Sequence, residues 1–257
     1  MIKSELPYIG ITDFVNREQV ELVKDCIPRR LNRRIHVGAM TSYKVQHGIP
    51  TRIGWENIWL SEEGLHELFV DDKEVFNVIH YADYSEPNLT KVEDLVEALR
   101  KSGPCVNGIQ LDMVWPSIGL VRESSTMFPE ISIILQVGKV ALGQLKTKKE
   151  SLLDRVISYE PFVEYFLIDF SMGKGIPFNP TEALMYIEEL IPYISQDRIV
   201  VAGGLGPTTY DLMLPVFKKY PNVSCDAQGQ LKKFPEPTLS MEIEKACGYV
   251  RGICSLL

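Results

Sequence analysis

The chain has 257 residues, of which 45% are hydrophobic, so it can bury one large core or two smaller ones. Its formal net charge of −7 and its isoelectric point near 5.3 argue against a nucleic-acid-binding surface, and we expect the arginines between residues 29 and 34 to form a solvated face. No apolar run is long enough to span a membrane, and the first residues lack the apolar segment of a signal peptide.

The cysteine and histidine patterns indicate the cellular compartment and whether to expect a metal site. The five cysteines have no CxxC spacing and are odd in number, which favours a reducing compartment, so we expect a cytoplasmic protein. The four histidines form no pair at metal-ligand spacing, so we expect no metal site. The sequence specifies no oligomeric state.

Eight short apolar segments are each followed by a stretch with helical periodicity, a pattern typical of parallel βα units. The predicted strands are Tyr8–Thr12, Arg34–Met40, Val75–Ala82, Val106–Leu111, Ile131–Val137, Tyr165–Asp169, Arg198–Ala202 and Asn222–Asp226. The predicted helices begin near Asn16, Ser61, Lys91, Ser124, Lys148, Asn179, Pro207 and Ser240.

The count of units predicts the fold. Eight βα units in about 250 residues, with no linker or low-complexity segment between them, predict an α/β protein with a single (β/α)8 TIM barrel domain over residues 1–257. An open doubly wound sheet is the alternative, because strand order cannot be read from one sequence.

In such a barrel the functional residues lie where strands end and βα loops begin. The candidates at these positions are Thr12, Asp13, residues 40–44, Asp83, Asp112, Gln136, Asp169, Gly203, Gly204 and residues 226–229. Any one of the aspartates can equally be a helix cap or a loop residue. The tryptophans Trp55, Trp59 and Trp115 can stack on a flat aromatic substrate or close a hydrophobic core.

Two glycine loops predict an anion site. AGGLGP follows the seventh predicted strand, and CDAQGQ follows the eighth, the two units where barrels often bind phosphate. Backbone amides at Gly203 and Gly204 would approach the phosphate, and a helix starting near Pro207 would add partial positive charge. A tight turn is the alternative for this loop. A third glycine loop, at Gly173–Gly175, is either an exposed loop or a lid whose Lys174 meets an anion.

Five segments taken together resemble phosphoribosylanthranilate isomerase, a TIM barrel of tryptophan biosynthesis. They are YIGIT, IQLD, FLIDFSMGKG, VVAGGLGP and VSCDAQG, and they occur in the family's order from Tyr8 to Gly229. The resemblance implies an Amadori rearrangement of a phosphorylated sugar-amine without metal or organic cofactor. It implies phosphate binding by Gly203, Gly204, Leu205, Gln228 and Gly229, and substrate binding by Gln110, Gly173, Lys174 and Gly175.

The catalytic part of the motif set departs from the family. The resemblance assigns the general acid to Asp169, but the family's basic cysteine in the first strand aligns with Ile9, which cannot accept a proton. Asp112 stands where the family has histidine, and Ala227-Gln228-Gly229 replaces its Ser-Ser-Gly. We expect Asp112 to be the substitute base, because a second carboxylate near Asp169 can separate the two pKa values into acid and base.

Three functions therefore remain open. The first is an isomerase-like barrel acting on a small phosphorylated sugar or sugar-amine, with weak or absent activity on the family's own substrate because of Ile9. The second is a non-catalytic relative that binds a phosphorylated metabolite. The third is another barrel chemistry, such as a lyase or aldolase, since the fold does not determine the reaction.

Overall fold

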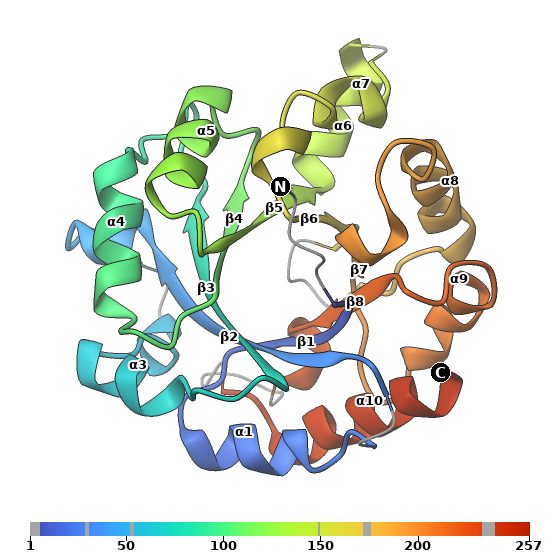
Figure 1. Ribbon diagram of the computed structural model, residues 1–257, viewed down its shortest axis with the longest axis horizontal. Helices are drawn as coiled ribbons and strands as arrows, with labels where there is room; N and C mark the ends of the chain where they lie inside the picture. Colours follow the sequence, from blue (N-terminus) through green and yellow to red (C-terminus); the bar gives the residue numbers. More distant parts are fainter. Residues whose placement is uncertain (1–5, 29–30, 52–53, 149, 172–175, 233–239) are drawn as a thin grey trace.

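The structure, a computed structural model, describes residues 6–28, 31–51, 54–148, 150–171, 176–232 and 240–257. Eight parallel strands form a closed barrel in sequence order, as Figure 1 shows in a view down the molecule's shortest axis. The strands are β1 (Tyr8–Thr12), β2 (Arg34–Ser42), β3 (Val75–Asp83), β4 (Gly108–Met113), β5 (Ser132–Gly138), β6 (Tyr165–Asp169), β7 (Ile199–Ala202) and β8 (Ser224–Ala227). Because β1 pairs with β8, with Ile9 opposite Cys225, the predicted TIM barrel is confirmed and the open sheet is excluded.

Helices surround the barrel (Figure 1). They are α1 (Arg17–Lys24), α2 (Tyr43–Gln46), α3 (Glu62–Leu68), α4 (Val92–Lys101), α5 (Ile118–Met127), α6 (Lys139–Lys148), α7 (Leu152–Val156), α8 (Pro180–Leu190), α9 (Leu214–Lys219) and α10 (Ile243–Leu256). Short 3₁₀ helices cover Trp55–Asn57, Glu160–Phe162, Gln196–Arg198, Tyr210–Met213 and Gly229–Leu231. Asn16, Ser61 and Asn179 cap α1, α3 and α8 through their side-chain oxygens, so these three helices start where predicted, whereas α10 follows Glu242 and not Ser240.

Three other predicted helix starts are wrong. Helix α5 begins at Ile118, six residues before Ser124, because the Ser117 hydroxyl caps the amide of Leu120. Lys148 is the last residue of α6, which follows β5 without an intervening loop. No α-helix begins at Pro207: a turn and a four-residue 3₁₀ helix precede α9 there, so the glycine loop does not lead into a helix N-terminus.

Side chains of the strands alternate between two apolar layers. Those facing outward pack against the helices in the large core, for example Ile9, Val37 and Val201. Those facing inward at the lower level fill the barrel with a separate cluster of Tyr8, Phe76, Val78, Ile134, Tyr165, Leu167, Val200 and Ala202. The barrel interior is therefore closed below, and any ligand site must lie at the carboxyl ends of the strands.

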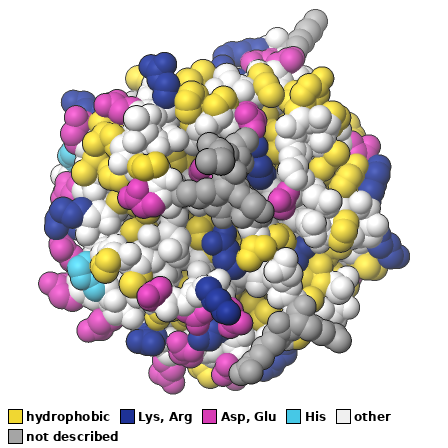
Figure 2. Space-filling view, viewed as in Figure 1, with side chains coloured by type: hydrophobic (Ala, Val, Ile, Leu, Met, Phe, Trp, Pro, Cys, Tyr) yellow, Lys and Arg dark blue, Asp and Glu magenta, His cyan; other side chains and the backbone are white. Residues whose placement is uncertain are grey.

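Of the arginines expected to form a solvated face, Arg33 and Arg34 do not do so, and Arg29 and Arg30 lie outside the described residues. Arg33 is buried, because its guanidinium donates 2.9 Å to the carbonyl of Val223. Arg34 lies over the Phe76 ring, 4.2 Å from its centre, and donates 2.9 Å to the Tyr165 hydroxyl. Figure 2 shows acidic and basic side chains interspersed around the rim of the face in view. No helix within the described residues is both long and apolar enough to cross a membrane.

Candidate functional site

Above the apolar cluster that closes the barrel interior, the inward-facing residues are polar. His80 on β3, Gln110 on β4, Gln136 on β5 and Asp169 on β6 are all at least 93% buried, with exposures of 5%, 2%, 7% and 5%. They lie where a barrel gathers functional side chains, near the carboxyl ends of the strands. Buried polar groups need partners, and these residues supply them to one another.

One chain of hydrogen bonds joins the two predicted catalytic aspartates. Gln136 donates from Nε2 to Asp169 Oδ2 (3.2 Å) and accepts from Gln110 Nε2 at Oε1 (2.7 Å). Gln110 Nε2 also lies 3.1 Å from His80 Nδ1, and His80 Nε2 lies 3.1 Å from Asp112 Oδ2. We infer that the amides donate toward both ends, because an ionised carboxylate can only accept. The structure thus connects Asp169 and Asp112 through three intermediate side chains.

The side chain of Asp112 has two hydrogen-bond partners. Besides His80, the hydroxyl of Tyr84 donates to the same oxygen, Oδ2. Burial lowers the pKa of His80, but the hydrogen bond to Asp112 and the charge of that carboxylate outweigh this, so the pKa lies above its usual value. Protonation of His80 would place a hydrogen on Nδ1 facing the Gln110 amide nitrogen. The Gln110 amide would then have to turn and release Gln136.

Asp169 sits at the end of β6 among hydrogen-bond donors. Its Oδ1 accepts from the Ser171 amide at 2.8 Å and from the Ser171 hydroxyl at 3.2 Å, in addition to the Gln136 bond at Oδ2. Such donors stabilise a carboxylate in its ionised form. The predicted residues Gly173, Lys174 and Gly175, just beyond, lie outside the described residues.

The loop after β7 has the backbone that glycine permits. Gly203 and Gly204 have φ angles of 131° and 62°, and a Cβ at Gly204 would lie only 2.3 Å from the carbonyl carbon of Ile176. Glycine at 204 is therefore required for close packing against the segment after β6. The amides of Gly204, Leu205 and Gly206 donate to no backbone acceptor within the described residues, while the Leu205 side chain is buried in the core.

The loop after β8 is built around a buried ion pair. Lys232 Nζ lies 2.9 Å from Asp13 Oδ2, and both residues are buried. Gln228, predicted to bind phosphate, donates its side-chain amide to Asp13 Oδ1 (3.1 Å), so that amide has a partner. Gly229 begins the short 3₁₀ helix that leads to Lys232. Asp13 also has a φ of 85°, an unusual conformation for a residue other than glycine.

Ile9 does not face the site. It lies in the layer between β1 and the helices, so the inward position of β1 at this level is Gly10. A Cβ at Gly10 would be 2.5 Å from Asp226 Oδ2. The carboxyl group of Asp226 on β8 therefore occupies the space that a side chain of β1 would take.

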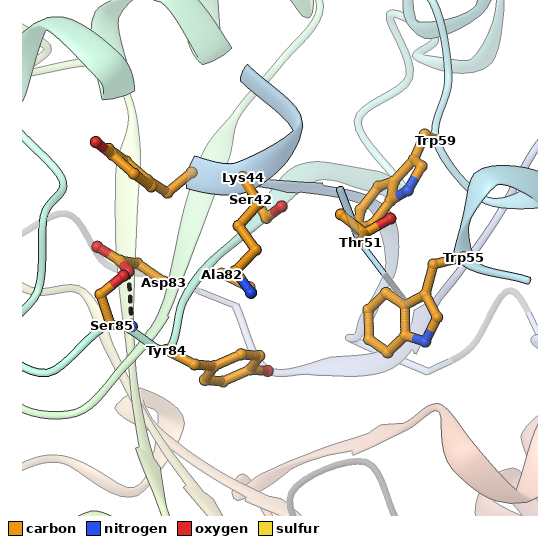
Figure 3. A pocket seen from close by; sticks show the side chains of 10 residues that line it. Ser42, Lys44, Thr51, Trp55, Trp59, Ala82, Asp83, Tyr84 and Ser85 are labelled. Carbon is orange, nitrogen blue, oxygen red and sulfur yellow. Dashed lines mark hydrogen bonds between the residues drawn. The ribbon is translucent and has the colours of Figure 1, made fainter. Parts of the chain in front are cut away.

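A pocket opens beside the hydrogen-bonded chain, between the loops that follow β2 and β3. It has a volume of about 360 Å³, and Figure 3 shows the residues that line it: Ser42, Tyr43, Lys44, Thr51, Trp55, Trp59, Ala82, Asp83, Tyr84 and Ser85. In Figure 3 the Lys44 amine points into the space between Tyr84 and Trp55. Tyr84 belongs both to this pocket and to the Asp112 cluster, so the pocket adjoins the buried carboxylates.

Two of the other candidate residues have structural roles. Asp83 accepts from the amides of Ser85 and Leu89 and thereby shapes the loop after β3; these donors, with the Thr90 hydroxyl, outweigh burial and lower its pKa. Trp115 stacks at 6.2 Å on Tyr159 and packs, half-buried, against the core, whereas Trp55 and Trp59 line the pocket. No group of three metal-ligating side chains occurs in the described part of the chain.

Sequence patterns do not indicate two members of this site. His80 belongs to no metal or triad spacing, and its link to Asp112 crosses neighbouring strands. Lys232 belongs to no motif. Asp226 lies within the candidate range 226–229, but its contact with Gly10 follows from the closure of the barrel between β1 and β8.

Comparison with known proteins supports the fold alone. No protein-family model matches the sequence, and no curated protein does. Among solved structures, phosphoribosylanthranilate isomerase from Thermus thermophilus has a TM-score of 0.64 at 12% identity, with coverage of 97% of this chain and 100% of that one. N-(5'-phosphoribosyl)anthranilate isomerase from Pyrococcus furiosus has a TM-score of 0.61 at 12% identity, with coverage of 96% and 98%.

A barrel of different chemistry is also similar. The 2-keto-3-deoxy-6-phosphogluconate aldolase from Zymomonas mobilis has a TM-score of 0.50 at 9% identity, with coverage of 98% of this chain and 94% of that one. At these identities the likeness concerns the fold. In fold, the chain is a TIM barrel like phosphoribosylanthranilate isomerase.

Proposed function

We propose that this barrel binds a small phosphorylated sugar or sugar-amine and isomerises it without a cofactor. The observation that carries the proposal is the hydrogen-bonded chain from Asp169 to Asp112 across the inner wall of the barrel. It fixes two carboxyl groups at the carboxyl ends of β6 and β4, and both are almost fully buried. Paired carboxyl groups in different surroundings are a common arrangement for acid–base chemistry.

The reaction class needs two proton transfers. In an Amadori rearrangement the ring oxygen takes a proton as its bond to C1 breaks, and C2 then loses a proton, which gives an enolamine that becomes the aminoketose. We assign the acid–base roles to Asp169 and Asp112, the residues indicated by the family resemblance and by its departure at the first strand. A positioned acid or base typically contributes about 10²–10⁴-fold to the rate.

The glycine loop after β7 supports a phosphate anchor. The amides of Gly204 and Leu205 have no backbone acceptor in the described part of the chain, and a phosphate dianion would supply one. With Gly203 and Gly229 they come from the two units, β7 and β8, where barrels often hold phosphate. A phosphate there would direct its sugar toward Asp169 on the neighbouring strand β6.

The pocket between the β2 and β3 loops fits the remainder of such a ligand. Its walls include the indoles of Trp55 and Trp59 and the ring of Tyr84, and Lys44 places a cation within it. A flat aromatic group with an acidic substituent matches these walls. The names of the similar isomerases contain such a group, anthranilate, joined to a phosphoribosyl unit.

A non-catalytic phosphometabolite-binding protein is the second candidate. It is favoured by the loop after β8, where the Gln228 amide is already bound to Asp13. A Schiff-base aldolase is less favoured, because no lysine lies in any of the eight strands.

The test is purified protein mixed with phosphoribosylanthranilate, followed by the fluorescence of the anthranilate group. We expect saturable binding and slow turnover, with turnover lost in Asp169→Asn and Asp112→Asn and retained in Asp211→Asn, which alters an exposed aspartate of a 3₁₀ helix. Binding without turnover would favour the second candidate. Absence of binding would contradict both.

A further inference from the structure

One carboxyl group of the barrel interior stands apart from the hydrogen-bonded chain. Asp226 is 5% exposed, and on the neighbouring strands it is paired with Ala202 on β7 and with Gly10 on β1, which is in turn paired with His36 on β2. Its carboxyl group thus lies between two residues with little or no side chain, and the next inward side chain is that of His36. The glycine loop proposed to hold phosphate starts directly after Ala202.

The partner of Asp226 is a fully buried histidine. His36 Nδ1 lies 3.4 Å from Asp226 Oδ2, while the His36 ring stacks on Tyr8 at 5.0 Å between centroids. Both atoms of this pair, and His36 Nε2 as well, are buried without a hydrogen-bond partner within the described residues. A charged pair at this depth would lose its hydration without gaining further hydrogen bonds, which is unfavourable.

The groups around Asp226 act on its pKa in both directions. The charges of Asp169 on β6 and of Asp13 at the end of β1 raise it, whereas His80 on β3 and a hydrogen bond from the Ala227 amide lower it. The tyrosines Tyr8 and Tyr249, from β1 and α10, are also close enough to interact with it. Burial raises the pKa of Asp226 to about 7, chiefly through loss of hydration. Burial lowers the pKa of His36 to about 3, so the histidine is neutral near pH 7.

We propose that Asp226 is a further proton donor of the site, a carboxyl group kept protonated beside the glycine loop, in addition to the acid–base pair of Asp169 and Asp112. The identity of the acceptor rests on the proposed function: it is an oxygen of a phosphorylated sugar held by the amides after β7. The Asp226 O–H bond breaks, the proton passes to the ligand oxygen, and a carboxylate remains. Solvent returns a proton to Asp226 after the product leaves.

The contrast with Asp169 supports this assignment. Asp169 accepts from two groups of Ser171 and from Gln136, which together favour a negative charge. Asp226 Oδ2 has no such donor in the described part of the chain. A neutral Asp226 is also compatible with a neighbouring phosphate dianion, whereas an ionised one would repel it.

The proton on Asp226 is tested directly by ¹³C NMR of protein labelled at the aspartate side-chain carboxyl. We expect one buried carboxyl signal that titrates near pH 7 and is absent from Asp226→Asn. Gly10→Ala provides a second identification, because its methyl group would displace the carboxyl and shift the same signal. If the Asp226 signal titrates in the ordinary range of exposed aspartates, the proposal is wrong.

The role of that proton is tested by sulfate binding, since sulfate keeps its charge across the titration range. We expect wild-type affinity to fall about tenfold from the acidic to the alkaline side of pH 7, corresponding to a pKa change of about one unit on binding. Asp226→Asn should bind sulfate equally at both pH values. A wild-type affinity that does not change with pH would overturn the donor role. If sulfate does not bind, the phosphate anchor of the proposed function is wrong. The NMR titration alone then decides whether Asp226 is protonated.

Discussion

The polar level of the barrel has two unlike halves. From β3 to β6 the inward side chains form one continuous set of hydrogen bonds from Asp112 to Asp169. From β8 to β2, Asp226 and His36 lie 3.4 Å apart, but neither Asp226 Oδ2 nor the two ring nitrogens of His36 have a hydrogen-bond partner among the described residues. The first half is one hydrogen-bonded network, and the second half is not.

The largest expected effect concerns the hydrogen-bonded half. Replacement of Asp169 by Asn keeps the shape but removes the carboxylate, so turnover of a phosphorylated sugar-amine should fall by about 10²–10⁴-fold. Steady-state kinetics on Asp169→Asn and on the exposed control Asp211→Asn provide the measurement. Similar losses in both variants would contradict a special role for the buried carboxylate.

The glycine loop after β7 should be intolerant of a side chain at Gly204. Gly204→Ala places a methyl group 2.3 Å from the Ile176 carbonyl carbon at a φ of 62°, and we expect the free energy of unfolding to fall by about 3 kcal/mol. Gly143→Ala is the matched control, because nothing lies within 4 Å of that position in helix α6. It should raise stability by about 0.5–1 kcal/mol. Urea unfolding measures both, and equal effects would show that Gly204 has no packing role.

The buried carboxyl group of Asp226 predicts a pH dependence of stability. The pKa of Asp226 rises from 3.8 unfolded to about 7 folded, so between these values the folded chain binds a proton that the unfolded chain has released. Stability should therefore fall as pH rises through this window, by on the order of 2–4 kcal/mol, and change no further above it.

The comparison for this pH effect is Asp226→Asn, which cannot titrate. Its unfolding free energy, measured by urea titration across the same pH range, should lack this component. Because other groups titrate equally in both proteins, the difference between the two curves isolates Asp226. A difference that is flat with pH would show that the carboxyl is not neutralised in the folded state.

The smallest effect is expected in the aromatic pocket. Lys44→Met keeps much of the side-chain length but removes the cation, so affinity for an acidic aryl ligand should fall about three- to tenfold, and less at high salt. Fluorescence titration with anthranilate, with Lys73→Met on the exposed surface as control, measures this. Equal affinity of Lys44→Met and wild type would show that Lys44 in this pocket does not contribute to ligand binding.

Much of the barrel was predictable because its units repeat. Apolar segments of strand length alternate with helical periodicity, and Asn16 and Asn179 mark helix starts with their caps. The start of α6 carries no such signal, because the helix begins at the residue after β5. The start of α5 is capped by Ser117, but the apolar residues that follow it resemble the strand before it.

The site was less predictable, because it depends on which face each strand turns inward. Tyr8 and Ile9 are both apolar and both buried, yet one faces the barrel interior and the other the helices, so sequence pattern does not distinguish them. Asp112 and Asp169 were found from motifs next to strand ends. The pairings of His80 with Asp112 and of Asp226 with Gly10 depend on register across the sheet, which no local pattern encodes.

The most direct measurement is a crystal structure of the protein soaked with ribose 5-phosphate. The account predicts phosphate oxygens on the amides of Gly204 and Leu205, with the hydroxyls or ring oxygen of the ribose within hydrogen-bond distance of Asp169 and Asp226. Phosphate bound elsewhere, or Gly204 and Leu205 amides turned away from the barrel interior with Asp169 out of reach of the sugar, would contradict it.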